Sequence, residues 1–168
     1  MKKFFFLYFL CAFTIFLSAQ TADKLEELLN TPAVSYEQAA WLALEAADVW
    51  DQSGAGIVPD PHEAFVVAQQ QQWLPDGIDS AAFARLDTVS LLLMRSFGLD
   101  GGIFYSLFKN PHYAYRELVY QEIIAGVSDP AMNVSGSTLV FMVNGILAKL
   151  EGTNWSPVIS VQPKGTEN

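Results

Sequence analysis

The hydrophobic and polar positions divide the chain into an apolar leader and a series of amphipathic helices. Residues 4–17 are apolar apart from Thr14. Further along, apolar side chains recur at the three- and four-residue spacing of an α-helix. The clearest stripe comprises Ala82, Leu86, Val89, Leu93 and Phe97. This pattern predicts a helix from Ala81 to Phe97, buried on most sides because neighbouring leucines widen the stripe.

Helix-start signals mark two leading helices. Asp60 and Asn110 are good N-caps, and each is followed by a proline at the first helical position, where its missing N–H costs nothing. Glu63 lies three residues after Asp60 and is expected to complete a capping box with it. We expect the two helices to run to about Trp73 and Ile124.

These leading helices open a repeat of about fifty residues. Residues 61–65 read PHEAF and residues 111–115 read PHYAY. Gly77 and Gly126, which follow the two helices, are expected to turn the chain with positive φ. A second helix then follows in each copy, and in the later copy it is expected from Ser135 to Leu150.

The second helix has a third relative near the N-terminus. Residues 34–44 align with residues 83–93 and 134–144 at offsets of 49 and 51. Ser35 and Gln38 have the spacing of another capping box, and Ser135 is a further N-cap. A repeated supersecondary unit buries its apolar face by stacking on its neighbours, so the repeat determines the fold.

The chain after residue 20 is therefore predicted to be an all-α domain of three helical-hairpin units. The leading helix of the first unit is shortened to residues 22–30, which abbreviates that unit. The units cover about residues 22–48, 60–99 and 110–150 of a domain spanning 21–151. Residues 48–60 and 98–110 are expected to be connectors, and residues 152–168 a C-terminal tail.

This pattern resembles the S-layer homology (SLH) domain of exported bacterial proteins. In that family a helix pair recurs at a similar interval, and the second helix is entered through Val-Thr-Arg-Ala-Glu. The resemblance covers residues 31–150, and residues 83–99 (FARLD through LLLMRSFGL) are its best local match. It implies three units around a pseudo-threefold axis. It also implies non-covalent attachment to cell-wall polysaccharide, often a pyruvylated polymer.

In the family, the arginine of this motif helps to bind the anionic glycan in grooves between units. At that position the aligned copies carry Tyr36, Arg85 and Gly136. Only the middle copy keeps a charged pair, formed by Arg85 and Asp87. The motif's Thr and Glu also act as a capping box, a structural role that requires no ligand.

The apolar leader is typical of a secretory signal peptide spanning residues 1–20. Lys2 and Lys3 supply the positive start, and the apolar run is too short for a permanent membrane span. The alternative is an uncleaved membrane anchor. Cleavage is expected after one of three small or polar residues, Ala19, Gln20 or Ala22. Cys11 lies inside the apolar run rather than at its end, which disfavours lipidation.

Composition and charge narrow the possible partners. Loss of residues 1–20 removes two lysines and no acid, which leaves 7 Lys and Arg against 18 Asp and Glu, a net charge of −11. Such a surface repels nucleic acid and anionic lipid. The leader holds the single cysteine, so disulfides and thiolate metal sites are excluded from the rest. No second permanent transmembrane span is expected.

The candidate ligand-binding residues are few. If glycan binds, grooves near Arg85, Tyr36 and Trp73 are the expected sites. Arg85 and Asp87 are two apart at a helix start and are not expected to face each other. They either serve a ligand or belong to a solvated or inter-unit ion pair. Aromatic residues crowd residues 104–120, including Tyr113, and offer either a sugar- or protein-binding surface or core packing.

Signals for catalysis are absent from the sequence. His62 and His112 occupy equivalent repeat positions without metal-ligand spacing, so capping or packing roles are favoured. No nucleophile elbow, phosphate loop or nucleotide fingerprint occurs. A hydrolase built on scattered carboxylates has no residue pair that singles it out. We therefore expect no enzyme, no metal and no cofactor.

The combined expectation is an exported, non-catalytic envelope protein. Its task would be attachment or scaffolding through an SLH-like domain that binds cell-wall glycan, in the periplasm or at the cell surface. The alternative is a protein–protein interaction module that has lost glycan binding, with another envelope protein as its partner.

Overall fold

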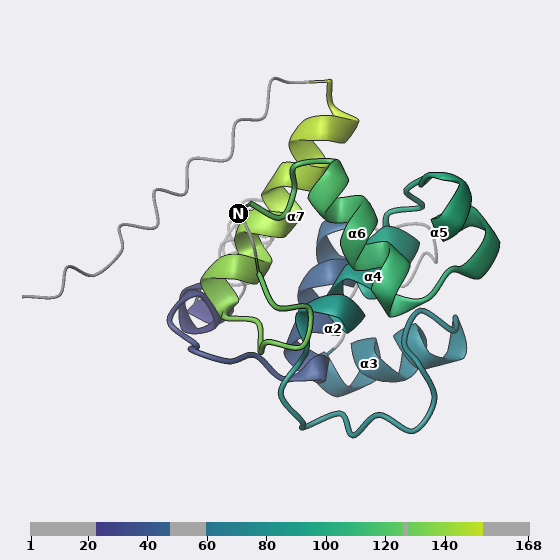
Figure 1. Ribbon diagram of the computed structural model, residues 1–168. Coiled ribbons are helices and arrows are strands. Elements are labelled where there is room, and N and C mark those ends of the chain that lie inside the picture. Colours follow the sequence, from purple (N-terminus) through teal and green to yellow (C-terminus); the bar gives the residue numbers. More distant parts are fainter. Residues whose placement is uncertain (1–22, 48–59, 126–127, 153–168) are drawn as a thin grey trace, which may run out of the picture.

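A computed structural model describes residues 23–47, 60–125 and 128–152, which form an all-α protein without strands (Figure 1). The all-α prediction is confirmed for these residues. A helix over residues 23–29 precedes the named helices. These are α2 (Tyr36–Ala46), α3 (Pro61–Gln70), α4 (Leu86–Ser96), α5 (Ile103–Phe108), α6 (Pro111–Tyr120) and α7 (Gly136–Leu150). The expected signal peptide, Gly126 and nearly all of the expected tail lie outside the described residues.

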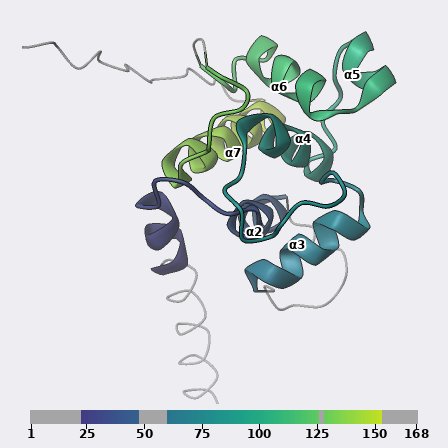
Figure 2. The same ribbon diagram turned by 60° about the horizontal axis from the view of Figure 1, so that its bottom comes forward.

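The middle of the molecule holds α2, α4 and α7, and the other helices lie around them (Figure 2). α3 packs on α2, α6 packs on α4, and α5 contacts α6. The core is built from fully buried aliphatic side chains of the three middle helices, among them Leu44, Leu92, Leu93, Leu139, Met142 and Ile146. In the part of the chain that the structure describes, no helix combines the length and apolarity that a membrane crossing requires.

A closed ring of three backbone hydrogen bonds joins the segments that enter α2, α4 and α7. The Ala84 N–H donates to the Val34 carbonyl (2.8 Å), and the Val134 N–H donates to the Ala84 carbonyl (2.9 Å). The Val34 N–H closes the ring by donating to the Val134 carbonyl (2.8 Å). All three residues are buried, so the ring satisfies backbone groups that water cannot reach.

The ring relates residues that are 50 positions apart, so the offsets of 49 and 51 used to align the helix starts are wrong by one residue. The N-caps follow the same spacing, at Ser35, Arg85 and Ser135. Arg85 is thus the N-cap of α4, and Leu86 is the residue equivalent to Tyr36 and Gly136. The side-chain pattern alone misplaced the middle copy, because Arg85 matched the family's arginine and the extended backbone was not foreseen.

The predicted helix starts are largely confirmed. Asp60 and Asn110 cap α3 and α6, each ahead of a proline, and Ser135 caps α7. Ser35 and Gln38 form the full capping box. The Asp60 side chain accepts the Glu63 N–H, without the reciprocal bond that would complete a box.

Several predicted boundaries are wrong. α4 begins at Leu86 rather than Ala81, because the preceding residues are held extended by the hydrogen-bond ring. α3 and α6 end at Gln70 and Tyr120, before the expected ends. The predicted connector 98–110 contains α5.

Left-handed residues end two of these helices. Gln72 has φ 57° and Glu122 has φ 61°, a region that glycine usually occupies. In each case the next N–H reaches five residues back, as Trp73 does to the Ala68 carbonyl (2.8 Å). Gly77 has φ 78°, as predicted for the turn that follows α3.

Candidate functional site

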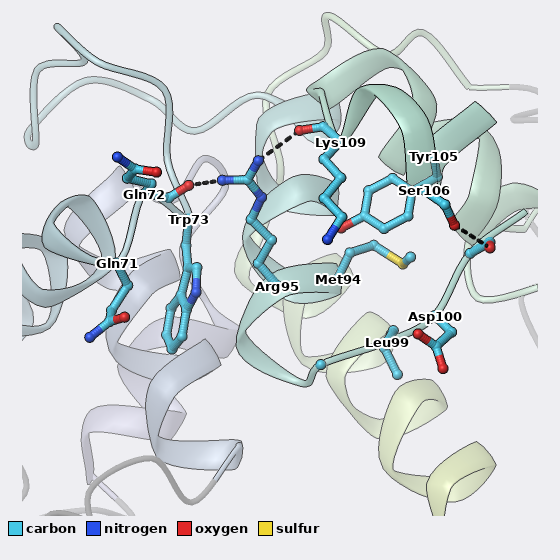
Figure 3. Close-up of a pocket in the computed structure, with 12 residues that line it drawn as sticks. Gln71, Gln72, Trp73, Met94, Arg95, Leu99, Asp100, Tyr105, Ser106 and Lys109 are labelled. Atoms are coloured by element: carbon cyan, nitrogen blue, oxygen red, sulfur yellow. Dashed lines mark hydrogen bonds between the residues drawn. The ribbon is translucent and has the colours of Figure 1, made fainter. Parts of the chain in front are cut away.

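A polar pocket of about 560 Å³ opens between the end of α3, the end of α4 and α5 (Figure 3). Two cationic residues, Arg95 and Lys109, line it together with the aromatic residues Trp73 and Tyr105. The remaining lining is mostly polar or glycine: Gln71, Gln72, Met94, Gly98, Leu99, Asp100, Gly101 and Ser106. An open pocket with amide, hydroxyl and cationic groups suits a hydrated polar ligand better than an apolar one.

Arg95 holds the three walls of this pocket together. Its guanidinium donates through Nη1 to the carbonyl of Gln72 and through Nη2 to the carbonyl of Lys109 (2.8 Å). These two carbonyls belong to the turn that ends α3 and to the C-cap of α5. In Figure 3 the guanidinium lies between Trp73 on one side and Lys109 and Tyr105 on the other.

The pocket is a local concentration of positive charge in an acidic chain. Neither ion pair found among the described residues includes Arg95 or Lys109. Both hydrogen-bond partners of Arg95 are neutral carbonyls, so its positive charge is not cancelled by a direct carboxylate contact. Asp100 is the single acidic residue in the lining.

Tyr105 anchors α5 to the rest of the protein. Its side chain is buried, and burial raises the pKa of its phenol, while the nearby Arg95 guanidinium acts in the opposite direction. The phenol therefore stays protonated at neutral pH and acts as a neutral wall. Gly101 makes room for the ring, because a Cβ at that position would lie 2.5 Å from Tyr105 Cδ1.

Three of the predicted binding residues meet at the junction of α2 and α4, away from this pocket. The Arg85 Nη2 donates to Asp87 Oδ2 (2.8 Å) and its Nε donates to Asp87 Oδ1 (3.3 Å). Tyr36 is buried, and its hydroxyl accepts the Arg85 N–H (3.3 Å). The hydrogen bond from Arg85 to Asp87 raises the pKa of the guanidinium.

The expectation that Arg85 and Asp87 do not face each other is wrong. It applied to two residues inside one helix, whereas Arg85 is an N-cap with extended backbone, φ −86° and ψ 146°. Its side chain can therefore fold back over the first turn. The two residues form an ion pair that is half exposed at Arg85 and lies within one unit rather than between units.

The other two predicted residues lie at separate places. Trp73 lines the polar pocket and packs in part against the core. Tyr113 lines a smaller cavity of about 190 Å³ between α5 and α6. Its ring is stacked with Phe104 at 5.8 Å and with Phe108 at 5.3 Å between centroids.

The sequence did not single out Arg95 or Lys109, and it indicated Tyr105 only as one of the aromatic residues within 104–120. Arg95 was covered only by the local family match over residues 83–99. Lys109 and Tyr105 fell in a segment read as a connector. The available sequence signal was that Lys109 lies inside the aromatic-rich segment 104–120 and Arg95 precedes that segment.

A second polar constellation, also unforeseen, links α2 to the start of α3. The Ser80 hydroxyl donates to Glu37 Oε1 (2.5 Å), and His62 Nδ1 lies 3.0 Å from the same oxygen. These bonds lower the pKa of Glu37, with Ser80 the largest cause and His62 the next. In a hydrolytic triad the histidine bridges serine and carboxylate, but here the carboxylate bridges the other two. The arrangement therefore suits a structural link.

Across the described residues, no group of three or more His, Cys, Asp or Glu side chains is placed to hold a metal ion. No protein-family model matches the chain, and no curated protein or solved structure is significantly similar to it. The site must therefore be interpreted from its own chemistry.

Proposed function

We propose that this protein is a non-catalytic module of the bacterial cell envelope that attaches to an acidic wall glycan. The glycan binds in the pocket between α3, α4 and α5. The observation that carries the proposal is the gathering of Arg95, Lys109 and Trp73 in one polar pocket of an acidic chain. Cations recognise the acidic groups of such polymers, and an indole ring offers a flat face to a sugar.

The backbone ring supports the three-unit, pseudo-threefold arrangement that accompanies this proposal. Val34, Ala84 and Val134 are spaced 50 residues apart and are joined head to tail in a cycle. An up-and-down helix bundle gives no reason for three segments distant in sequence to meet in this way. The cycle is what three equivalent units around one axis would produce at their entry segments.

The position of the proposed glycan site differs from that implied by the resemblance to SLH domains. In the 50-residue register, the residues at the family's arginine position are Tyr36, Leu86 and Gly136, none of which is cationic. Arg85 is engaged by Asp87. We therefore assign the role of anion recognition to Arg95 and Lys109, at the opposite end of α4.

Sedimentation with purified peptidoglycan sacculi that retain their wall polymers tests this proposal. The wild-type protein should pellet with the sacculi. Lys109→Glu should lower the bound fraction about tenfold, while the Lys109 carbonyl that anchors Arg95 remains in place. Lys24→Glu carries the same charge change on the helix over residues 23–29 and should bind as the wild type does. A wild-type protein that stays in the supernatant, or equal losses in both variants, would refute glycan attachment.

The second candidate function is an envelope protein–protein interaction module. One specific observation favours it, which is the exposure of four large apolar side chains on the short helix α5. Co-purification with an envelope protein that survives digestion of the glycan would support this function.

A further inference from the structure

The outer face of α5 and α6 is unusually apolar for an acidic protein. Four side chains of α5 are largely exposed, namely Ile103 (83%), Phe104 (65%), Leu107 (71%) and Phe108 (52%). Tyr120, at the end of α6, is 83% exposed. Contiguous exposed apolar residues of this kind mark interaction surfaces in soluble domains.

This face also has stacked aromatic rings and a cavity. The rings of Phe104 and Phe108 both stack on Tyr113, which fixes the aromatic groups relative to α6. Beside Phe104, a cavity of about 190 Å³ lies between α5 and α6, with Tyr120 and Arg116 in its lining. A cavity of about 150 Å³ accommodates a benzene ring, so this one has room for a single large apolar side chain.

The charged residues around the cavity determine which polar group of a partner can lie beside the inserted apolar side chain. Both oxygens of Glu117 are already engaged, Oε2 by the Gly102 N–H (2.9 Å) and Oε1 by the Gln121 amide (3.0 Å). Arg116 is exposed and forms neither of the ion pairs found in the described residues. Both donors to Glu117 are neutral, so its negative charge remains, but its two oxygens are occupied. Arg116 is therefore the charged side chain of the cavity that still has donors for a partner.

The segment around the cavity is much less acidic than the chain as a whole. Residues 95–120 carry three Lys or Arg and two acidic residues, whereas the whole chain carries 9 and 18. Charges more than about 10 Å apart are largely screened at physiological salt. A partner at this face therefore meets an apolar surface whose charges nearly balance, unlike the strongly acidic chain as a whole.

We propose that the face formed by α5 and α6 binds a protein segment that inserts one large apolar side chain into the cavity beside Phe104 and sets a carboxylate against Arg116. This proposal rests on the second function above and is independent of the glycan pocket. An apolar anchor in a pocket with a flanking charge is the usual composition of an interaction hot spot. A cavity of this size suits one inserted protein side chain, whereas attachment to a lipid surface would require only the exposed apolar residues.

Selection of a displayed library of random peptides against the purified protein tests this inference. Enriched peptides should pair an aromatic or leucine residue with a nearby Asp or Glu. A synthetic representative should bind about tenfold or more weakly to Phe104→Ser, Leu107→Ser and Arg116→Glu. Arg116→Lys keeps the charge and should stay within about threefold of the wild type. Phe83→Ser removes an exposed ring elsewhere, 61% exposed, and should also leave binding unchanged.

Several outcomes would overturn the inference. They are the absence of enrichment, enrichment of peptides without acidic residues, and binding that Arg116→Glu does not weaken. Binding to phosphatidylcholine–phosphatidylglycerol vesicles that the same α5 variants abolish would assign the face to lipid instead. A dimer in sedimentation that these variants dissociate would assign it to a second copy. Because the sacculi experiment uses Lys109 and this one uses Phe104 and Arg116, failure of one is distinguishable from failure of the other.

Discussion

Gly136 lies so close to Leu28 that no side chain fits between them. A Cβ on Gly136 would lie 1.6 Å from the Leu28 carbonyl oxygen, and the Gly136 N–H donates to the Thr31 carbonyl (2.9 Å). The first residue of α7 and the end of the helix over residues 23–29 are therefore joined through bare backbone. Because the nearest atom is backbone rather than a flexible side chain, the contact cannot be relieved locally.

We therefore expect Gly136→Ala to destabilise the protein, although alanine normally favours a helix over glycine. The added methyl group must push the helix over residues 23–29 away from α7, and overpacking of this kind costs about 1–3 kcal/mol. Urea denaturation measures the change. Gly102→Ala is the control, since its Cβ would meet only a side-chain oxygen at 3.4 Å. Equal stabilities of Gly136→Ala and the wild type would contradict the close approach.

Replacing Gln72 or Glu122 by glycine is expected to stabilise the protein. Both hold a left-handed conformation that costs an ordinary L-residue about 1 kcal/mol. Gln72→Gly and Glu122→Gly should each raise the free energy of unfolding by about that amount. The neighbouring Gln71→Gly and Gln121→Gly change residues with φ −78° and −79°, and should be destabilising. Loss of stability in all four variants would count against the left-handed turns.

Local chemistry was enough to predict much of this fold. A capping side chain ahead of a proline fixes the starts of α3 and α6, because both signals act within one turn of Asp60 or Asn110. The apolar stripe of α4 is read from side-chain spacing alone. These features depend on neighbours in sequence, so no tertiary contact is required to anticipate them.

The features that sequence reasoning missed depend on distant partners. Arg85 is extended because the neighbouring Ala84 pairs with Val34 and Val134, fifty residues away on either side. α5 forms in a segment opened by two glycines, since burial of Tyr105 anchors it. The pocket exists because Arg95 reaches two carbonyls on other helices. Backbone pairing and long side-chain reach leave little trace in the residue pattern.

The carboxylate of Glu37 should make stability depend on pH. The Ser80 hydroxyl and His62 lower the pKa of Glu37 below its ordinary value of 4.5. The folded state thus favours the charged form, and its contribution is present above pH 4.5 and lost as pH falls through the folded pKa. Glu37→Gln should lower the free energy of unfolding by about 1 kcal/mol at pH 7. This deficit should shrink towards zero in strong acid.

Urea denaturation of both proteins at several pH values between neutral and strongly acidic would follow this difference. Glu63→Gln provides a matched control, because Glu63 is an exposed carboxylate whose backbone N–H, rather than its side chain, is engaged by Asp60. Its effect should be small and nearly independent of pH. A Glu37→Gln deficit that stays constant throughout would contradict the stabilising role of the charged carboxylate.

Arg95 should not be replaceable by lysine. The planar guanidinium places two N–H groups towards the Gln72 and Lys109 carbonyls at once, whereas an ammonium group is a single compact centre on a flexible stem. Arg95→Lys should keep the charge yet release one of the two helix ends, at a cost of about 1–3 kcal/mol. Hydrogen exchange should then become faster at the Lys109 amide, which bonds to Tyr105 at the end of α5. Arg116→Lys, a matched change on an unpaired arginine, should alter neither stability nor exchange. If Arg95→Lys exchanges as slowly as the wild type at Lys109, Arg95 is not what fixes α5 against α4.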